Sequence, residues 1–309
     1  MTGGAGFIGS HIVAELVQRG EAVRVYDNFA TGLERNLAPF AGKIEVVRGD
    51  LRDAAAVTAA LRGATHVLHL GALGSVPRSI EDPVASNDVN INGTLNVLVA
   101  AREAGVQRVV FSSSSSVYGS NPELPKRVGM PTAPISPYAV TKQAAESYTC
   151  VFWSVYGLPT VALRYFNVFG ENQRPDSAYA GVIPKFMDWA MRGEPVVMHG
   201  DGLQSRDFTY IDNVVSANLL AATTEGVEGE VFNIACGGSY TLVDIVDALE
   251  RVIGRPIERR HVESRIGDVR ASLADIEPAG RRLGYRVLVG LDEGLARTWE
   301  SFRRRYAAA

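Results

Sequence analysis

The stretch MTGGAGFIGS, residues 1–10, decides the fold class of this chain. Its glycines Gly3, Gly6 and Gly9 form the pattern G-x-x-G-x-x-G at the start of a helical pattern. Glycines at such a place let the backbone approach a pyrophosphate, which the free N–H groups and the dipole of the helix can bind. A turn with two small packing residues would show the same pattern. The residues that follow must therefore decide between these interpretations.

The residues after the glycines alternate between amphipathic helices and short apolar strands. Apolar side chains of residues 7–20 lie on one helical face, which ends at a glycine. Further helices are expected near residues 53–62 and 88–104. Strands are expected in AVRVYD (22–27), IEVVRGDL (44–51), THVLHLGA (65–72) and QRVVFSSS (107–114). The alternation predicts an α/β fold, a doubly wound parallel sheet with helices on both faces.

The regular alternation ends near residue 166. A helix is expected from residue 139 to Tyr156, followed by the strand TVALRYF (160–166). Beyond this strand, loops rich in Pro and Gly separate single helices. We therefore expect a dinucleotide-binding domain over residues 1–165. A smaller mixed C-terminal domain for the substrate is expected over residues 166–309, interleaved with the first.

The composition is that of an ordinary globular protein. Hydrophobic residues make up 46% and charged residues 21% of the chain, and its net charge is -3. The basic cluster at residues 303–305 fits a solvated helix end, so no nucleic-acid partner is expected. No apolar run reaches about 18 residues and no charged leader precedes the glycines. We therefore expect no membrane span and a cytoplasmic location.

Neither the cysteines nor the histidines have the spacing of a metal site. Cys150 and Cys236 lie far apart in the sequence, which fits unpaired core residues in a reducing compartment. His66, His69 and His199 show no ligand spacing either. No bound metal is expected.

A carboxylate supports the nucleotide interpretation of the glycines. Asp27 ends the expected strand AVRVYD, 18 residues after Gly9. This is close to the spacing of about 20 typical of a residue that binds the adenine ribose hydroxyls. The phosphate of NADP would meet a negative charge there, so NAD is favoured. A plain turn residue remains the alternative for Asp27.

The glycine spacing resembles the fingerprint of the short-chain dehydrogenase/reductase superfamily, whose members carry a Tyr-x-x-x-Lys pair on a helix. This chain has Tyr138 and Lys142, and a spacing of four places both on one helical face. A free tyrosine titrates near pH 10, so its use as a base near pH 7 requires about 4 kcal/mol in favour of the phenolate. Lys142 and a positively charged nicotinamide can supply it together. A hydroxyl from the serine run 112–116 can hydrogen-bond the same oxygen.

The chain as a whole resembles an extended short-chain dehydrogenase/reductase of the UDP-hexose 4-epimerase family. The matching segments, in order, are TGGAGFIGS, DNFATG, GDL, HLGA, NINGT, SSSSSVYG, SPYAVTK, LRYFNVFG, GDGLQSRDFTYIDNV and RIGDVR. The resemblance implies a Rossmann-type fold, NAD as cofactor, a UDP-sugar as substrate and a homodimer through the helices near 88–104 and 139–156. It also implies that the sugar is oxidised to a 4-keto form, turns over, and takes the hydride back on its other face.

Site residues are carried over from the family position by position. The catalytic residues implied are Ser114, Tyr138 and Lys142. Implied NAD contacts are Gly3, Gly6, Phe7, Ile8, Gly9, Asp27, Asn28, Asp50, Leu51, Leu70, Ala72, Asn90, Tyr138, Lys142 and Tyr165. Implied substrate contacts are Gly74, Ser75, Ser114, Ser115, Asn167, Gln173, Val182, Arg206, Arg265, Asp268 and Ser272, with Ser75 and Ser115 near an acetamide group.

Several positions bear on which sugar is bound. In galactose-type members a lysine stands at the position of Gly74, and some have a tyrosine at that of Ser272, so the smaller residues here enlarge the sugar site. LGSVPRS (73–79), Gln173 and VIPKF (182–186) resemble the subgroup that acts on UDP-N-acetylglucosamine. We expect 4-epimerisation of UDP-N-acetylglucosamine and UDP-N-acetylgalactosamine, and of UDP-glucose and UDP-galactose as well. The alternative is that Gly74 and Ser272 are ordinary loop residues without a role in sugar binding.

Other activities of the same fold stay open. Related dehydratases and decarboxylases need a Glu or Asp where this chain has Ser114–Ser116, so epimerisation without elimination is favoured. A UDP-glucuronate substrate is an alternative, because Arg174 or Arg78 could pair with its carboxylate. A non-catalytic NAD-sensing protein is the other alternative, although such proteins tend to lack the Tyr-Lys pair.

The beginning of the chain departs from the family pattern. Only Met1 and Thr2 precede the glycines, where family members have a central apolar strand. Loss of that strand would leave ladder hydrogen bonds unpaired, a cost of several kcal/mol against a total stability of about 5–15 kcal/mol. We expect that the first strand is truncated in this sequence and that the native chain extends upstream of Met1.

Overall fold

The computed structural model describes residues 1–175, 180–263 and 270–307. The central parallel sheet contains the strands β1 (Val23–Asp27), β2 (Ile44–Arg48), β3 (His66–His69), β4 (Arg108–Ser114), β5 (Thr160–Tyr165) and β10 (Val231–Ile234). Four of them are hydrogen-bonded in the order β10-β5-β4-β3, and β1 pairs with β2. The parallel sheet expected from the alternation is confirmed.

Residues 1–3 join these two groups of strands. Thr2 pairs in parallel with Tyr26 of β1 and with His69 of β3. The Thr2 N–H donates to the Leu68 carbonyl at 3.0 Å, and the Leu70 N–H donates to the Thr2 carbonyl at 3.2 Å. Thr2 thus lies where the central strand was expected.

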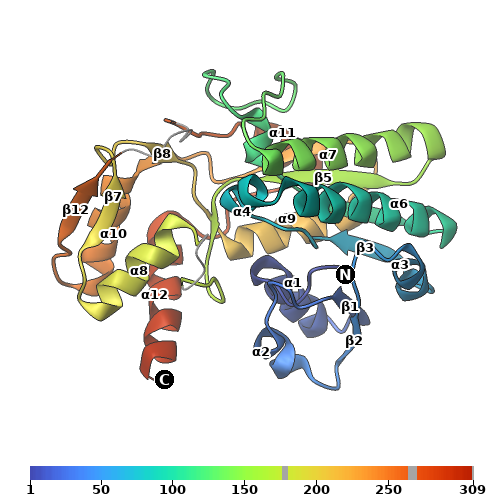
Figure 1. Cartoon of the computed structure of the whole chain (residues 1–309), viewed down its shortest axis with the longest axis horizontal. Coiled ribbons are helices and arrows are strands. Elements are labelled where there is room, and N and C mark those ends of the chain that lie inside the picture. The colour runs from blue at the N-terminus through green and yellow to red at the C-terminus, as the bar shows by residue number, and fades with distance from the viewer. Residues whose placement is uncertain (176–179, 264–269, 308–309) are drawn as a thin grey trace.

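Helices cover both faces of the sheet (Figure 1). Those of the first 160 residues are α1 (Phe7–Gln18), α2 (Glu34–Leu37), α3 (Ala54–Leu61), α4 (Val76–Glu81), α5 (Pro83–Asn87), α6 (Gly93–Glu103) and α7 (Pro137–Tyr156). The helices α6 and α7 lie on one face, and α1 lies on the other beside α9 (Ile211–Thr223). This is the doubly wound arrangement. Within the described ranges, no helix combines the length and apolar character needed to cross a membrane.

Local chemistry sets the ends of α7, the helix of the Tyr-Lys pair. The Ser136 hydroxyl accepts the N–H of Ala139, and Pro137 stands in the first turn, where its missing N–H costs nothing. Gly157, whose φ of +68° suits glycine, caps the helix after its last residue Tyr156. The helix therefore begins two residues before the expected residue 139 and ends at the expected Tyr156.

The second half of the chain is more irregular. It contains the short strands β6 (Val168–Phe169), β7 (Val196–His199), β8 (Ser205–Arg206), β9 (Thr209–Tyr210), β11 (Tyr240–Thr241) and β12 (Arg259–Val262). Its other helices are α8 (Val182–Arg192), α10 (Leu242–Ile253), α11 (Glu277–Leu283) and α12 (Leu291–Ala307). Both α9 and β10 come after residue 166 in the chain. Nevertheless β10 pairs with β5 in the parallel sheet, and α9 packs beside α1 against β4 and β5. The division of the domains at residue 165 stays a prediction.

Candidate active site

A cavity of about 340 Å³ lies where β1 and β3 end and α1 begins, and we call it the nucleotide cavity. Ligands of open parallel sheets bind at this carboxyl edge. The predicted NAD contacts that line it are Gly3, Gly6, Phe7, Ile8, Gly9, Asp27, Asn28, Asp50, Leu51, Leu70 and Ala72. The structure thus brings together eleven residues that the resemblance had placed in one site.

Close backbone approach explains two of the three glycines. A Cβ at Gly9 would lie 2.1 Å from the carbonyl oxygen of Gly3. A Cβ at Gly3, whose φ is +69°, would lie 2.7 Å from the backbone nitrogen of Gly71. The helix α1 begins at Phe7, and its first N–H groups have no partner inside the helix. They are suited to bind a pyrophosphate in the cavity.

The Asp27 carboxylate holds the glycine loop against the end of β1. Its Oδ2 accepts the N–H of Ala5 at 3.0 Å, and its Oδ1 accepts the N–H of Phe29 at 2.8 Å. A second carboxylate, Asp50, lines the same cavity, and the Arg52 guanidinium beside it holds the pKa of Asp50 well below its usual range. Asp50 is therefore ionised but paired with Arg52, and the carboxylate on this wall that supports NAD over NADP is Asp27.

Four predicted NAD contacts, Asn90, Tyr138, Lys142 and Tyr165, are not among the residues that line the cavity. Asn90 is buried, and it accepts the N–H of Leu73 at 2.7 Å and donates to Thr141 Oγ1 at 3.0 Å. The Tyr165 hydroxyl donates to Asn218 Oδ1 at 2.9 Å. Their contact with the cofactor stays a prediction.

Sequence reasoning did not name several residues of the cavity wall. Some of them stood inside the motifs DNFATG and GDL, so the signal was present for Ala30, Thr31, Gly32 and Gly49. Gly71, Leu73 and Ser112 likewise stood inside the segments HLGA, LGSVPRS and SSSSSVYG, while Tyr26 and Val89 lie outside the segments that match the family. The lining residues missed are Tyr26, Ala30, Thr31, Gly32, Gly49, Gly71, Leu73, Val89 and Ser112, whereas Arg78, named above for a uronic carboxylate, also lines the cavity.

The Tyr-Lys pair lies on α7 beside the end of β4. The Lys142 ammonium donates to the Ser112 carbonyl at 2.7 Å and lies 4.9 Å above the centre of the Phe111 ring. Burial lowers the pKa of Lys142 to about 8. The start of α7 is anchored where the Tyr138 N–H donates to the Ser79 hydroxyl at 2.9 Å. Both functional groups therefore lie beside strand β4.

Ser114 is the residue that links β4 to the phenol. It ends the strand, and its hydroxyl accepts the N–H of Ser116 at 3.2 Å, which caps a short 3₁₀ turn (Ser115–Tyr118). Burial raises the pKa of Tyr138, and a hydrogen bond with Ser114 lowers it, with the net shift upward. In the protein alone the phenol is thus protonated at neutral pH, and proton removal requires a further positive charge.

A second cavity of about 260 Å³ lies beside α8. The predicted substrate contacts on its wall are Asn167, Gln173, Val182 and Arg206. Asn167 has a φ of +33°, and its side chain donates to the Asp207 carbonyl at 3.0 Å, which fixes the loop beside Arg206. Lining residues that sequence reasoning missed include Phe169, Lys185, Trp189, His199 and Phe208.

The other predicted substrate contacts lie in different places. Gly74 and Ser75 line the nucleotide cavity. The Ser272 N–H donates to the Ser205 carbonyl at 3.0 Å, next to Arg206 in the chain. Ser115 begins the 3₁₀ turn after β4. Arg265 and Asp268 fall outside the described residues.

The parallel sheet, the glycine loop at its edge and the Tyr-Lys helix define a Rossmann-type dinucleotide-binding protein. Residues 1–235 match the model of the NAD dependent epimerase/dehydratase family. The UDP-glucose 4-epimerase of Mycolicibacterium smegmatis is 37% identical over 309 residues, 99% of this chain and 98% of that relative.

Two solved structures are similar to this chain over nearly its whole length. One is a UDP-N-acetylglucosamine 4-epimerase from Methanobrevibacter ruminantium in complex with UDP-N-acetylmuramic acid. It has a TM-score of 0.94 and 38% identity, and the match covers 98% of this chain and 97% of that one. The other is the UDP-glucose 4-epimerase of Thermus thermophilus in complex with NAD, with a TM-score of 0.89, 38% identity and the same coverage. The chain belongs to the NAD-dependent epimerase/dehydratase family, and its cofactor is NAD.

The glycine loop allows a direct test of cofactor binding. We expect Gly9→Ala to weaken NAD binding at least 100-fold, because the added methyl would lie 2.1 Å from the Gly3 carbonyl and force the loop apart. Gly290→Ala is the control, since a Cβ there meets no atom within 4 Å, and its Kd should stay within twofold. Calorimetric titration with NAD measures both. A folded Gly9→Ala protein that binds NAD within threefold of the parent would contradict the assignment.

Proposed function

We propose that the protein is an isomerase that interconverts the 4-epimers of UDP-sugars through a 4-keto sugar. The observation that carries the proposal is the arrangement at the end of β4. Tyr138 shares a hydrogen bond with Ser114, and Lys142 donates to the carbonyl of Ser112, a residue of the nucleotide cavity wall. The base, a cation and the cofactor site therefore share one edge of the sheet.

In this proposal Tyr138 takes the proton from the sugar 4-hydroxyl, and Ser114 donates a hydrogen bond to the same sugar oxygen. When bound, NAD supplies the acceptor for the hydride from C4 and a positive charge that favours the phenolate. Because burial raises the pKa of Tyr138, cations near it are required for proton transfer near neutral pH. Lys142, with a pKa of about 8, is still largely an ammonium at pH 7.

The keto sugar must then turn about its link to the diphosphate, so the nucleotide has to be held more firmly than the sugar. We assign the nucleotide to Asn167 and Arg206 of the second cavity, since a guanidinium suits a diphosphate. The segment Ser114–Ser116 contains no carboxyl group for the second proton transfer of a dehydratase or decarboxylase. This composition favours epimerisation.

The space around Gly74 supports an N-acetylated sugar among the substrates. A Cβ at Gly74 would meet no atom within 4 Å, and Ser75 lies beside it on the cavity wall. We therefore propose UDP-N-acetylglucosamine and UDP-N-acetylgalactosamine as substrates, together with UDP-glucose and UDP-galactose. UDP-glucuronate is the second candidate, because Arg78 lines the same cavity and could bind a carboxylate.

The phenol hydroxyl should be indispensable. We expect Tyr138→Phe to lower kcat for interconversion of UDP-N-acetylglucosamine and its galacto epimer by about 10²- to 10⁴-fold, the range for loss of a general base. Tyr148→Phe is the matched control, because Tyr148 lies on the same helix and is 40% exposed. Coupled assay of the product epimer measures both. Activity within tenfold of the parent in Tyr138→Phe would remove this residue as the base.

A panel of three UDP-sugars tests substrate choice. We expect turnover of UDP-N-acetylglucosamine and UDP-glucose, and a kcat/KM for UDP-glucuronate at least 100-fold lower. The Gly74→Lys variant should reduce kcat/KM for the N-acetylated sugar at least tenfold more than for UDP-glucose, because the longer side chain would fill the open space. Preferred turnover of UDP-glucuronate would favour the second candidate. Tight NAD binding without turnover of any of the three would favour a sensing role.

We further propose a homodimer in which α7 contributes to the interface. Val140, Tyr148, Val151 and Val155 lie on one side of this helix, and each is at least 40% exposed. We expect the parent protein to have the mass of two chains by light scattering and Val151→Arg to have the mass of one, since a charge cannot be buried there without a partner. Val46→Arg on β2 is the exposed control. A parent with the mass of one chain would refute the dimer.

A further inference from the structure

Behind the Tyr-Lys pair lies a buried ion pair between Glu146 of α7 and Arg164 of β5. Arg164 Nη2 donates to Glu146 Oε1 at 2.6 Å, and its Nε donates to Oε2 at 2.9 Å. The two side chains are only 8% and 5% exposed. Such a two-point bond fixes the direction of both groups as well as their distance. The pair is therefore a rigid connection between the helix and the sheet.

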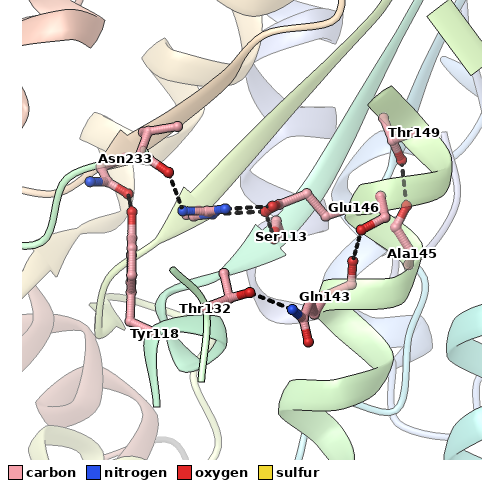
Figure 2. Close-up of polar contacts among 11 residues, drawn as sticks. Ser113, Tyr118, Thr132, Gln143, Ala145, Glu146, Thr149 and Asn233 are labelled. Carbon is pink, nitrogen blue, oxygen red and sulfur yellow. Dashed lines mark hydrogen bonds and ion pairs between the residues drawn. The ribbon is translucent and has the colours of Figure 1, made fainter. Parts of the chain in front are cut away.

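The same carboxylate also contacts β4. The Ser113 hydroxyl donates to Glu146 Oε2 at 2.6 Å (Figure 2). The two residues next to Ser113 in the strand also contact α7. The Ser112 carbonyl accepts a hydrogen bond from Lys142, and the Ser114 side chain is hydrogen-bonded to Tyr138. Three successive residues of β4 thus meet three residues of α7.

The spacing of the three residues of α7 places all of them against β4. Tyr138, Lys142 and Glu146 follow at intervals of four, so they lie on one face of the helix. The contact of Lys142 is a single hydrogen bond at the end of a flexible side chain. The carboxylate of Glu146, in contrast, accepts three hydrogen bonds. Of the three contacts, that of Glu146 restrains a sliding motion of α7 along β4 most strongly.

Arg164 itself is held from the side away from α7. Its guanidinium lies 4.8 Å from the centre of the Tyr118 ring, and Nη1 donates to the Val128 carbonyl at 3.3 Å. The Tyr118 hydroxyl donates to Asn233 Oδ1 of β10 at 2.7 Å (Figure 2). The arginine cannot follow the helix without breaking these contacts. It therefore acts as a fixed point to which Glu146 is attached.

We propose that Glu146 and Arg164 are positioning residues, which set the register of α7 on β4 and so place the Tyr138 hydroxyl against Ser114. This inference rests on the proposed function of Tyr138. Glu146 acts through the helix and contacts neither cavity wall. Loss of the pair should thus affect the chemical step while leaving both binding sites intact, because a shift of about 1 Å in a reacting group can cost about 10²-fold in rate.

The test is Glu146→Gln, which keeps the size of the side chain and removes its charge. We expect kcat per bound NAD to fall about 10- to 100-fold, while KM for the UDP-sugar and the Kd for NAD change less than twofold. The matched control is Glu228→Gln. Glu228 is bonded at 2.5 Å to Arg108, which begins β4 at the opposite end of the strand. This variant also loses a partly buried ion pair with β4, but its kcat should stay within twofold of the parent.

Ser113→Ala is a second variant for the case that Glu146→Gln does not fold. It removes one of the three hydrogen bonds to the carboxylate and should lower kcat about threefold to tenfold with unchanged KM. If the folded variants keep kcat within twofold of the parent, the pair serves stability alone and the inference is overturned. The same holds if Glu228→Gln loses as much activity. If the parent turns over no UDP-sugar, the proposed function fails first, and the inference fails with it.

Discussion

Tyr138, Lys142 and Glu146 follow one another along α7, and each bonds one of three successive serines of β4. These bonds form only if β4 stays extended through Ser112–Ser114 and α7 stays helical from Tyr138 to Glu146. The strand must remain extended through Ser114, although five serines would suit a loop equally well. Burial of the strand against α7 and β5 keeps it extended, because its backbone groups are then paired in the sheet.

The cofactor site depends on a second, separate constraint, which is backbone crowding at the glycine loop. Gly3 and Gly9 approach so closely that no side chain fits between them. The Asp27 carboxylate accepts the N–H of Ala5 inside this loop and the N–H of Phe29 in the segment after β1. The same carboxylate that is suited to a ribose therefore also holds the loop in shape, so fold and cofactor preference share one residue.

Electrostatics at the Tyr-Lys pair shows how fold and chemistry are coupled. Burial raises the pKa of Tyr138 and lowers that of Lys142 to about 8. Both shifts oppose the charged forms that the proposed proton transfer uses. In the protein alone the phenol of Tyr138 stays neutral. The positive charge of bound NAD would favour the phenolate that the proposed proton transfer needs. The buried pair of Glu146 and Arg164 balances its own charges, so it can orient α7 without adding net charge to this region.

The sequence by itself determined the parallel α/β sheet, the glycine loop with Asp27, and the common face of Tyr138 and Lys142. These features are local, since periodicity and spacing within one segment express them. Only the tertiary structure decided that Lys142 bonds Ser112, that Arg164 meets Glu146, and which side chains line the second cavity. Such contacts join elements that are distant in the chain, and they follow from the register and packing of whole elements against one another. No spacing rule within a single segment contains that information.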